Sequence, residues 1–432
     1  MIESGTRAAD SKRPPLHYVI IGNSAAGIGA AEGIRQIDKR GAITIITNEP
    51  HHTYSRPLIS YLLQGKVTEE KMKYRADSFY EDTNCTLLKG VSAIKIDDGA
   101  KQVVLADGGR IGYDKLLVAT GSSAFVPPME GLDTVTDVHT FMTLDDAKKI
   151  NDSPGQDKRV LIVGAGLIGL KCAEGIAGGA EQGARPRARR IITLDLAPRI
   201  LSSILDEDGA KLVQNHLESK GIECKLSVGI KRFEGNAAIL NTGEKIDFDV
   251  LVLAVGVRPN TALLDGIADI ERGICVNEKS ETTAPDIYAA GDCTQTLDVS
   301  SGQQKIMALL PNAYMQGECA GINMAGGDAA FNKAIPMNAI GFCGLHMVTA
   351  GHYTGNEYSE NENGNYKRLF YSGNKLNGYI LIGNVDKAGI YTSLIRERTP
   401  LDTIDFALVC QKPGLMAFSK EDRTMKLGEA QA

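Results

Sequence analysis

Residues 16–49 decide the fold, and they read LHYVIIGNSAAGIGAAEGIRQIDKRGAITIITNE. Their first part, residues 16–21, is a short apolar run with β-branched residues, which predicts a buried strand before a glycine-rich turn. Helical spacing over 28–37 then leads to a second buried strand at 42–47 and to the acidic Glu49. The order strand, glycine-rich turn, helix, strand and acid is typical of a βαβ unit that binds a dinucleotide.

The small residues of this turn can be explained by the geometry that the turn requires. Gly22 permits the tight turn, and Gly27 permits close packing of helix on strand. Ser24 stands at the position of the middle glycine, so a small hydroxyl is expected beside a bound pyrophosphate. The helix N-terminus offers main-chain N–H groups to an anion, and Glu49 could accept hydrogen bonds from ribose hydroxyls.

The pattern occurs a second time in the chain. A predicted strand at 159–163 is followed by a complete glycine motif, GAGLIG at 164–169, and then by a helix through 170–176. The next strand, 191–194, ends at Asp195. Two such units predict two dinucleotide sites, and the usual combination in one chain is a flavin and a nicotinamide nucleotide.

The connection within the second unit, residues 177–190, is longer than most helix-to-strand loops. It is also strongly basic, with arginines at 185, 187, 189 and 190. Three interpretations remain open: a docking patch, a clamp for a 2′-phosphate, and a solvated insertion.

Further patterns complete the expected fold. Buried strands are predicted at 115–121, 250–256 and 287–292, and a hairpin of short strands at 366–381. We therefore expect an α/β fold with two Rossmann-like dinucleotide-binding domains and a C-terminal α+β domain through which an oligomer could form. The predicted parts are a disordered lead-in (1–15), an FAD-binding domain (16–145 and 280–334), an NAD-binding domain (146–279) and the C-terminal domain (335–432).

The composition excludes several classes of function. The chain has 432 residues, 43% of them hydrophobic, with 53 acidic and 47 basic residues and a net charge of −6. A mildly acidic chain does not offer the basic face that nucleic acid needs. No apolar run is long enough to span a membrane, and the polar first 15 residues lack the apolar core of a signal peptide. A cytoplasmic location is therefore expected.

The eight cysteines are scattered, and none belongs to a Cys-x-x-Cys pair. Zinc and iron–sulfur sites need closely spaced ligands, so no metal site is expected. Reduced and mostly buried thiols are the simplest interpretation.

Taken together, the motifs resemble those of the flavoprotein reductases in the pyridine nucleotide–disulfide oxidoreductase superfamily, whose fold is glutathione-reductase-like. The stretch EPHHTYSRPL at 49–58 is similar to a pattern found in rubredoxin reductases, in ferredoxin reductases of oxygenase systems and in the flavin portion of NADH nitrite reductases. Five segments in the family's order carry the resemblance: Gly22–Gly27, Ala119–Gly121, Gly164–Gly169, Gly256–Asn260 and Ala289–Asp292.

The resemblance implies cofactor-binding roles for the residues at matching positions. For FAD these are Gly22, Ser24, Ala25 and Gly27 at the pyrophosphate, Glu49 at the adenosine ribose, Arg56 on the adenine side, Thr120 and Gly121 closing over the cofactor, Asp292 at the ribityl or phosphate end, and Ala313 in a helix whose N-terminus faces the flavin. For NAD(H) they are Gly164, Gly166, Leu167, Ile168 and Gly169 at the pyrophosphate, Asp195 at the adenosine ribose, and Gly256.

Two departures from the family pattern shape the expected chemistry. Thiol-dependent relatives carry one or two cysteines after the ribose acid, whereas residues 54–63 contain none. Many relatives place a glutamate two residues after the third glycine of the nicotinamide motif, where this chain has Lys171, with Glu174 one turn later. These two residues can pair along a helix and are candidates for flavin-proximal positions.

The expected activity is that of an FAD-dependent NADH oxidoreductase that passes electrons to a separate acceptor, either an iron–sulfur or rubredoxin-like protein or another subunit. No catalytic residue beyond the flavin is required. The alternatives are a flavin subunit of a larger complex such as a tungsten aldehyde oxidoreductase or a nitrite reductase, an NADH oxidase, and a thiol reductase acting through Cys85 or Cys343. Asp195 predicts a preference for NADH, against which Arg199 and the arginines at 185–190 could favour NADPH.

Overall fold

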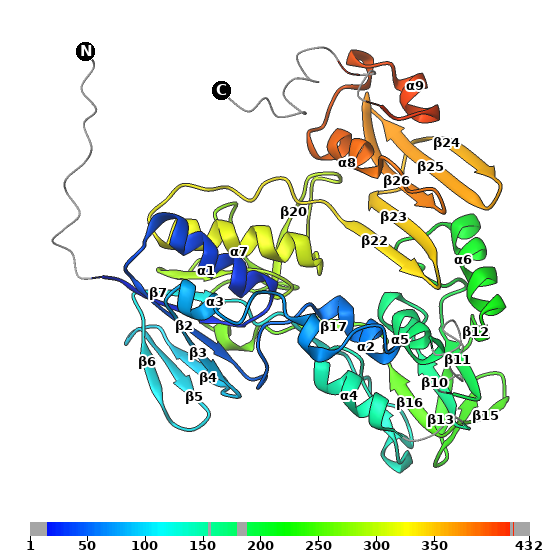
Figure 1. The fold of residues 1–432 in the computed structure, drawn as a ribbon, viewed down its shortest axis with the longest axis horizontal. Helices are drawn as coiled ribbons and strands as arrows, with labels where there is room; N and C mark the ends of the chain where they lie inside the picture. Colours follow the sequence, from blue (N-terminus) through cyan, green and yellow to red (C-terminus); the bar gives the residue numbers. More distant parts are fainter. Residues whose placement is uncertain (1–14, 154–156, 179–187, 415–417, 419–432) are drawn as a thin grey trace.

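The structure is a computed structural model that describes residues 15–153, 157–178, 188–414 and 418. Three five-stranded sheets form its main layers, of which two are parallel and one is antiparallel. Figure 1 shows the first sheet on the left, the second at the lower right and the antiparallel sheet above the second. The predicted N-terminal lead-in, apart from Pro15, lies outside the described residues.

The first sheet has the strand order β19-β7-β1-β2-β3, with all neighbours parallel. Its apolar strands are buried on both faces, as a parallel sheet requires. Tyr18 and Ile20 face the helices, while Val19 and Ile21 face a small antiparallel sheet, β4-β5-β6. The elements of this first unit are β1 (His17–Ile21), α1 (Ala25–Ile37), β2 (Ala42–Thr47), α3 (Phe79–Asp82), β3 (Cys85–Lys89), β4 (Ala93–Asp97), β5 (Gln102–Leu105), β6 (Arg110–Gly112), β7 (Lys115–Val118), β19 (Ile287–Ala289) and α7 (Leu310–Met324).

The second unit repeats this layout. Its parallel sheet has the order β12-β11-β10-β16-β9, with helices on one face and the antiparallel sheet β13-β14-β15 on the other. Its elements are β9 (Val138–His139), α4 (Leu144–Asp152), β10 (Arg159–Val163), α5 (Leu167–Ala177), β11 (Arg190–Leu194), α6 (Glu207–Ser219), β12 (Ile222–Lys225), β13 (Ile230–Phe233), β14 (Ala237–Leu240), β15 (Lys245–Asp247) and β16 (Val250–Leu253).

The C-terminal sheet is antiparallel, with the order β22-β23-β26-β25-β24. One face packs against α8 and α9, and the other shares a hydrophobic core with the second unit through side chains such as Phe342 and Ile380. The Tyr366 hydroxyl also donates to Asp206 at 2.6 Å, just before α6. The elements are β22 (Met337–Phe342), β23 (Leu345–Gly351), β24 (Asn356–Glu362), β25 (Asn365–Ser372), β26 (Lys375–Ile382), α8 (Ala388–Arg396) and α9 (Phe406–Gln411).

Short elements connect these three parts. An antiparallel ribbon of β8 (Ser122–Ala124) and β17 (Val257–Pro259) links the first unit to the second. Helix α2 (Ile59–Leu63) belongs to the first unit by sequence, yet its Ile59 and Leu63 lie in the core of the second unit. The hairpin of β20 (Thr294–Asp298) and β21 (Gln303–Lys305) follows β19 and precedes α7.

The predicted fold class is confirmed. The strands at 42–47 and 159–163 are found with the predicted bounds, but both motif helices begin earlier than predicted, at Ala25 and Leu167. The reason is that the glycine motif itself forms the first helical turn, with no side-chain cap to mark the start. Within the described ranges no helix is long and apolar enough to cross a membrane.

Candidate functional site

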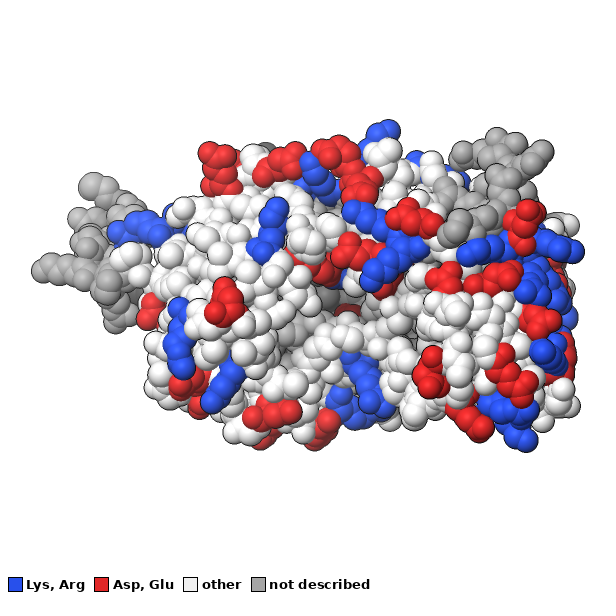
Figure 2. Space-filling model, turned by 90° about the horizontal axis from the view of Figure 1, so that it is seen from below, with Lys and Arg blue, Asp and Glu red and all other residues white. Residues whose placement is uncertain are grey.

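A cavity of about 620 Å³ opens at the carboxyl ends of β1, β2 and β7. This edge of a parallel sheet is where α/β proteins bind ligands. The opposite side is lined from the connections with the second unit, by residues 259–263 and by Thr140, Met142, Thr143 and Asp146. Seen from below, the molecule is hollowed near the centre of this face, and mostly uncharged residues surround the hollow (Figure 2).

The glycine-rich turn of the first unit forms one wall of the cavity. Gly22 has φ +124°, and a Cβ there would overlap the Ala119 carbonyl oxygen. A Cβ on Gly27 would overlap the carbonyl oxygen of Gly22, so close helix–strand contact requires glycine there. Ser24 precedes α1 without capping it, and the first-turn N–H groups from Ala25 onward are available to an anion. These donors suit a dinucleotide pyrophosphate.

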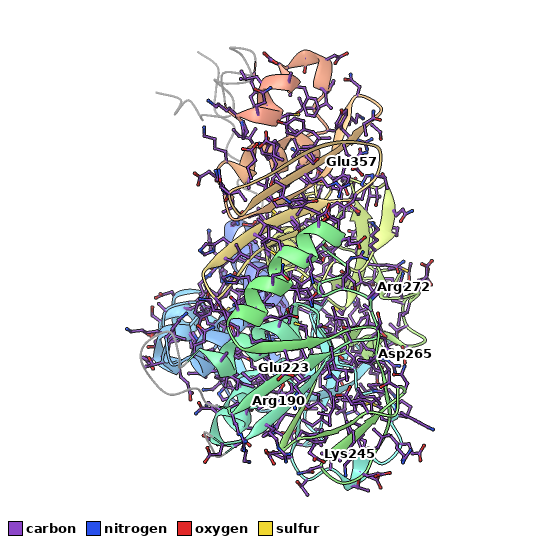
Figure 3. The ribbon with its side chains drawn as sticks, turned by 90° about the vertical axis from the view of Figure 1, so that its right-hand side faces the viewer. Arg190, Glu223, Lys245, Asp265, Arg272 and Glu357 are labelled. Carbon is purple, nitrogen blue, oxygen red and sulfur yellow. The ribbon has the colours of Figure 1, made fainter. Side chains whose placement is uncertain are left out.

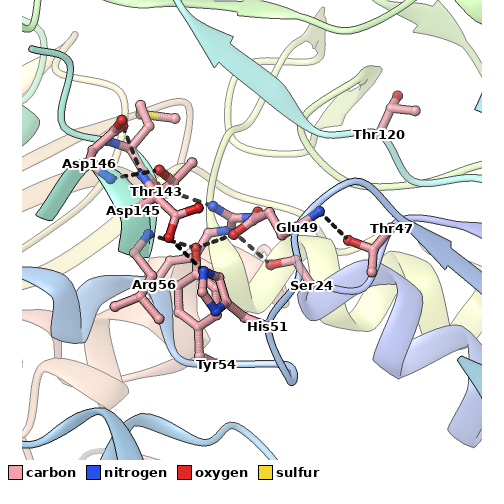
Figure 4. A network of polar contacts seen from close by, with 12 residues as sticks. Ser24, Thr47, Glu49, His51, Tyr54, Arg56, Thr120, Thr143, Asp145 and Asp146 are labelled. Atoms are coloured by element: carbon pink, nitrogen blue, oxygen red, sulfur yellow. Dashed lines mark hydrogen bonds and ion pairs between the residues drawn. The ribbon is translucent and has the colours of Figure 1, made fainter. Parts of the chain in front are cut away.

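Glu49 lies at the centre of a side-chain network (Figure 4). It forms an ion pair with Arg56 and accepts a hydrogen bond of 2.6 Å from the Tyr54 hydroxyl. The Arg56 guanidinium also donates to the Ser24 hydroxyl at 3.3 Å and to the Met142 carbonyl at 3.2 Å. The predicted ribose acid and the predicted Arg56 are therefore in direct contact, between the glycine-rich turn and the start of the second unit.

Thr120 lies on the other side of the cavity, whereas Asp292 lies behind the lining residue Ser122 and does not itself line the cavity. The Thr120 hydroxyl donates to the Asn260 carbonyl at 2.6 Å, and the Asn260 amide returns a hydrogen bond to the Thr120 carbonyl at 2.9 Å. Gly121 has φ +65°, and a Cβ there would meet no atom within 4 Å. Burial raises the pKa of Asp292, and this is opposed by a hydrogen bond from Ser122 at 3.2 Å and by the charge of Arg56.

Helix α7 packs beside the turn that carries Asp292. It begins at Leu310, with Ala313 buried in its first turn. The Gln316 side chain accepts a hydrogen bond of 2.8 Å from the Gly291 N–H, which ties the turn before Asp292 to the helix. Helix α7 contacts α1 at glycines, because a Cβ at Gly29, Gly33, Gly317 or Gly321 would overlap main-chain atoms of the other helix.

The second unit repeats the glycine turn with one informative difference. Gly164 has φ +115°, and a Cβ on Gly169 would overlap the Gly164 carbonyl oxygen, as in the first unit. A Cβ on Gly166 would meet no atom within 4 Å, so the space beside this residue is open to a ligand. Leu167 and Ile168 form the uncapped first turn of α5. Both oxygens of Asp195 accept main-chain hydrogen bonds, from Ala165 at 2.7 Å and from Ala197 at 2.8 Å.

Gly256 lies on the connection between the two units. It has φ +128°, is exposed, and accepts a hydrogen bond of 2.9 Å from the Phe125 N–H through its carbonyl. Its position links the second glycine unit to the β8–β17 ribbon. The ribbon also carries Arg258, whose guanidinium lies 3.9 Å from the centroid of the Phe125 ring.

Lys171 and Glu174 form the predicted ion pair on α5. The Lys171 ammonium also donates to the Gly341 carbonyl at 3.1 Å and lies 5.1 Å from the centroid of the Tyr61 ring on α2. Glu174 accepts a hydrogen bond of 2.7 Å from the Cys343 N–H. The pair therefore joins α5, α2 and the C-terminal sheet, while proximity to a flavin remains a prediction.

Of the described arginines that could favour NADPH, Arg190 and Arg199 are held by other groups, whereas Arg189 is exposed and its main-chain N–H donates to the Lys158 carbonyl at 2.8 Å. Arg190 and Glu223, labelled on adjacent strands in Figure 3, form two parallel hydrogen bonds of 2.7 Å. The Arg199 guanidinium donates to the carbonyls of Leu205 at 3.1 Å and Ser202 at 3.3 Å. The predicted clamp or docking residues at 185 and 187 lie outside the described residues.

The cysteines that the sequence left as candidates lie in different parts of the fold. Cys85 is on β3, and burial raises the pKa of its thiol. Cys343 lies in the turn between β22 and β23 with φ 47°. Among the residues described by the structure, none of the acidic, histidine and cysteine side chains form a group of three that could hold a metal ion.

Several residues around the cavity had not been identified from the sequence. Asn260 ends one of the motif segments, but no role was predicted for it. Its hydrogen bonds to residues 120–123 could not be inferred without the fold. Thr140, Met142 and Thr143 line the cavity from the connection to the second unit. A capping box formed by Thr143 and Asp146 marks the start of α4, but this signal indicates a helix terminus and not a ligand site.

Known proteins share both the sequence pattern and the fold. Residues 16–317 match the family described as pyridine nucleotide-disulphide oxidoreductase, and residues 336–399 match the rubredoxin NAD+ reductase C-terminal domain. The chain is 30% identical to subunit epsilon of the NADH-dependent phenylglyoxylate dehydrogenase of Aromatoleum evansii, over 89% of this chain and 92% of that one. It is 33% identical to an NADH oxidase of Methanocaldococcus jannaschii, over 73% of this chain and 71% of the other.

A solved structure shows the same fold. The covalent putidaredoxin reductase–putidaredoxin complex matches with a TM-score of 0.83 at 22% identity, over 93% of this chain and 97% of the matched chain. The predicted oxidoreductase class, with FAD and a nicotinamide nucleotide as cofactors, is confirmed at the level of the family. By its sequence, its two nucleotide units and its C-terminal domain, the chain belongs to the pyridine nucleotide-disulphide oxidoreductase family.

Proposed function

We propose that the chain is an NADH-dependent flavoprotein reductase of the cytoplasm that passes electrons to a separate acceptor. The observation that carries this proposal is the pairing of two nucleotide units with a cysteine-free α2. Bound FAD supplies the redox chemistry, taking a hydride from NADH and releasing electrons to the acceptor. The protein's own task is to bind the two nucleotides and to hold them in a fixed relative position.

In the first unit we assign the α1 N-terminus and Ser24 to the FAD pyrophosphate. Glu49 would accept a ribose hydroxyl without losing Tyr54 or Arg56, because a carboxylate has about four acceptor positions. Asp292 would accept hydrogen bonds from the ribityl end. The first turn of α7, in which the Ala313 N–H already donates to the Leu309 carbonyl, would direct the N–H groups of Leu310 and Asn312 at the flavin. The glycine contacts of α1 with α7 keep the two helix N-termini at a fixed separation.

In the second unit we assign the open side of Gly166 and the N-terminus of α5 to the pyrophosphate of NADH. Asp195 would accept ribose hydroxyls with the lone pairs that its two main-chain donors leave free. A preference for NADH is supported because Arg199 is bound to main-chain carbonyls and Arg190, at the opposite end of β11 from Asp195, is bound to Glu223. The exposed Arg189 is the described arginine that argues against it. Lys171 would lie near the flavin, where its charge is balanced by Glu174.

The C-terminal domain supports a protein acceptor over a thiol substrate. It matches a domain named for rubredoxin NAD+ reductase, and electron transfer of this kind needs no cysteine in the reductase. The raised pKa of Cys85 lowers its reactivity. We propose an iron–sulfur or rubredoxin-like protein as the acceptor.

A second candidate is a flavin subunit of a larger enzyme. The similarity to a dehydrogenase subunit over nearly the whole of both chains favours it. Native mass measurement after purification from the source cell separates the two, since a free reductase would elute without stoichiometric partners. Oxygen uptake with NADH tests the third candidate, an NADH oxidase.

The decisive experiment measures flavin content and reduction by NADH. The purified protein should be yellow with about one FAD per chain, and Asp292→Ala should retain less of it. NADH-to-dye electron transfer should persist in a folded variant in which all eight cysteines are Ser or Ala. A folded, colourless wild type with no affinity for added FAD would contradict the proposal, as would loss of transfer in the cysteine-free variant with FAD still bound.

A further inference from the structure

The loop at 49–56, which carries the predicted ribose acid, is bonded to the segment at 142–146 (Figure 4). The Arg56 guanidinium donates to the Met142 carbonyl at 3.2 Å, and the Leu144 N–H donates to the Tyr54 hydroxyl at 3.0 Å. A third contact joins His51 to Asp145 at 2.7 Å. Together these three contacts form a junction between two segments that are far apart in the sequence.

The segment at 142–146 is the first turn of the second unit. It begins α4, with a capping box between Thr143 and Asp146. The next turns bury Ala147 and Ile150 in the core that α4 shares with α5, α6 and the C-terminal sheet. A shift of this turn is therefore transmitted to the packed helix and not absorbed by a loose loop.

The cavity is lined by both sides of this junction. Glu49 and Arg56 contribute from the loop, and Thr140, Met142 and Thr143 contribute from the connection. A ligand held by Glu49 in this cavity therefore lies against the start of α4. The Tyr54 hydroxyl connects Glu49 directly to the start of α4, because it donates to Glu49 at 2.6 Å and accepts from the Leu144 N–H.

We propose that Tyr54 is a positioning residue that couples occupancy of this cavity to the order of α4 and so to the second nucleotide unit. The proposal rests on the proposed function in taking FAD as the ligand. A ribose hydroxyl on Glu49 orders the carboxylate, the ordered carboxylate fixes the Tyr54 hydroxyl, and that hydroxyl holds the Leu144 amide. Because binding couplings are reciprocal, an ordered α4 also favours FAD binding.

The test uses amide hydrogen exchange over residues 142–150, in the full chain, before and after saturation with FAD. In wild type, FAD should slow exchange of this segment on the order of tenfold. Tyr54→Phe removes both hydroxyl contacts and should cut this FAD-dependent slowing to less than about threefold, even when FAD is saturating. The KM for NADH should rise by roughly threefold or more, with kcat changed less.

Tyr80→Phe is the matched control. The Tyr80 hydroxyl also makes one donated and one accepted bond, to Asn23 at 2.8 Å and from the Thr53 N–H at 3.3 Å, and both bonds stay within the first unit. This variant should weaken FAD binding but keep the full FAD-dependent slowing over 142–150. Equal slowing in wild type and Tyr54→Phe, or no slowing in FAD-saturated wild type, would overturn the coupling and leave the proposed function intact. A wild type that binds no FAD would overturn both.

Discussion

The two nucleotide units follow one plan, and their differences lie at the ligand side of the sheet. Both place a glycine with positive φ after the strand that opens the glycine motif, β1 or β10. In both, the first N–H of that strand donates to an aspartate: His17 to Asp114, just before β7, and Arg159 to Asp249, just before β16. The middle glycine position holds Ser24 in the first unit and Gly166 in the second.

The acids of the two units are also held differently. Glu49 is bound by side chains, which reach from the turn at Ser24 to the start of α4. Asp195 is bound by main-chain N–H groups, and the next residue, Leu196, is 74% exposed. Glu49 is thus enclosed by a network that also contacts the start of the second unit, which would suit a cofactor that stays bound. The second unit is open and suits a nucleotide that binds and leaves.

The largest expected difference between the two units is in how much stability each glycine turn loses when one methyl group is added to it. Gly22→Ala places a Cβ against the Ala119 carbonyl at φ +124°, so we expect a loss of about 3 kcal/mol or more in the free energy of unfolding, together with loss of FAD. Gly166→Ala adds the same group in open space, so stability should change by less than about 0.5 kcal/mol. Urea unfolding of both variants measures the difference.

The Gly166→Ala variant also tests what the open space is for. If NADH lies there, its KM should rise several-fold while FAD content stays that of wild type. An unchanged KM for NADH would show that Gly166 does not contact the nucleotide, and it would weaken the contrast between the two units.

The next effect concerns the choice of nucleotide in the open unit. Wild type should favour NADH over NADPH on the order of a hundredfold in kcat/KM, because under the proposed function Asp195 would accept ribose hydroxyls and would repel a 2′-phosphate. Asp195→Asn removes the charge and keeps an oxygen for one of the two main-chain donors, so the ratio should fall roughly tenfold. The measurement is kcat/KM for both nucleotides with an artificial acceptor. A wild type that favours NADPH would show that arginines of the basic connection at 185–190 reach the site.

The comparison of the two units also shows which features the sequence could predict and which it could not. Strands and glycine turns were predicted because apolar runs and Gly22 or Gly164 are local signals. The bonds of Arg56 to Met142 and of Thr120 to Asn260 join residues 86 and 140 positions apart, and no local pattern encodes such pairings. For the same reason, the core shared by the C-terminal sheet and the second unit was not foreseen.

The smallest expected effect is on the pH dependence of the free energy of unfolding, and it arises in the second unit from the pairing of Arg159 with Asp249. The Arg159 guanidinium and N–H both donate to Asp249 and lower the pKa of that carboxyl to about 2. In the first unit, Asp114 bonds the main-chain N–H of His17. A carboxyl whose pKa is depressed by folding stabilises the native state above its unfolded pKa, near 3.9. That contribution is lost as the pH falls from about 4 to about 2.

We therefore expect Asp249→Asn to flatten the fall in unfolding free energy between about pH 4 and pH 2. Because the side chains of Arg159 and Asp249 are 38% and 34% exposed, solvent screening limits the effect to about 1 kcal/mol or less. Urea unfolding at a series of pH values measures it, and Arg159→Gln should flatten the same range, with the double variant adding little. An acid slope in Asp249→Asn equal to that of wild type would show that this pair does not set the acid sensitivity of the second unit.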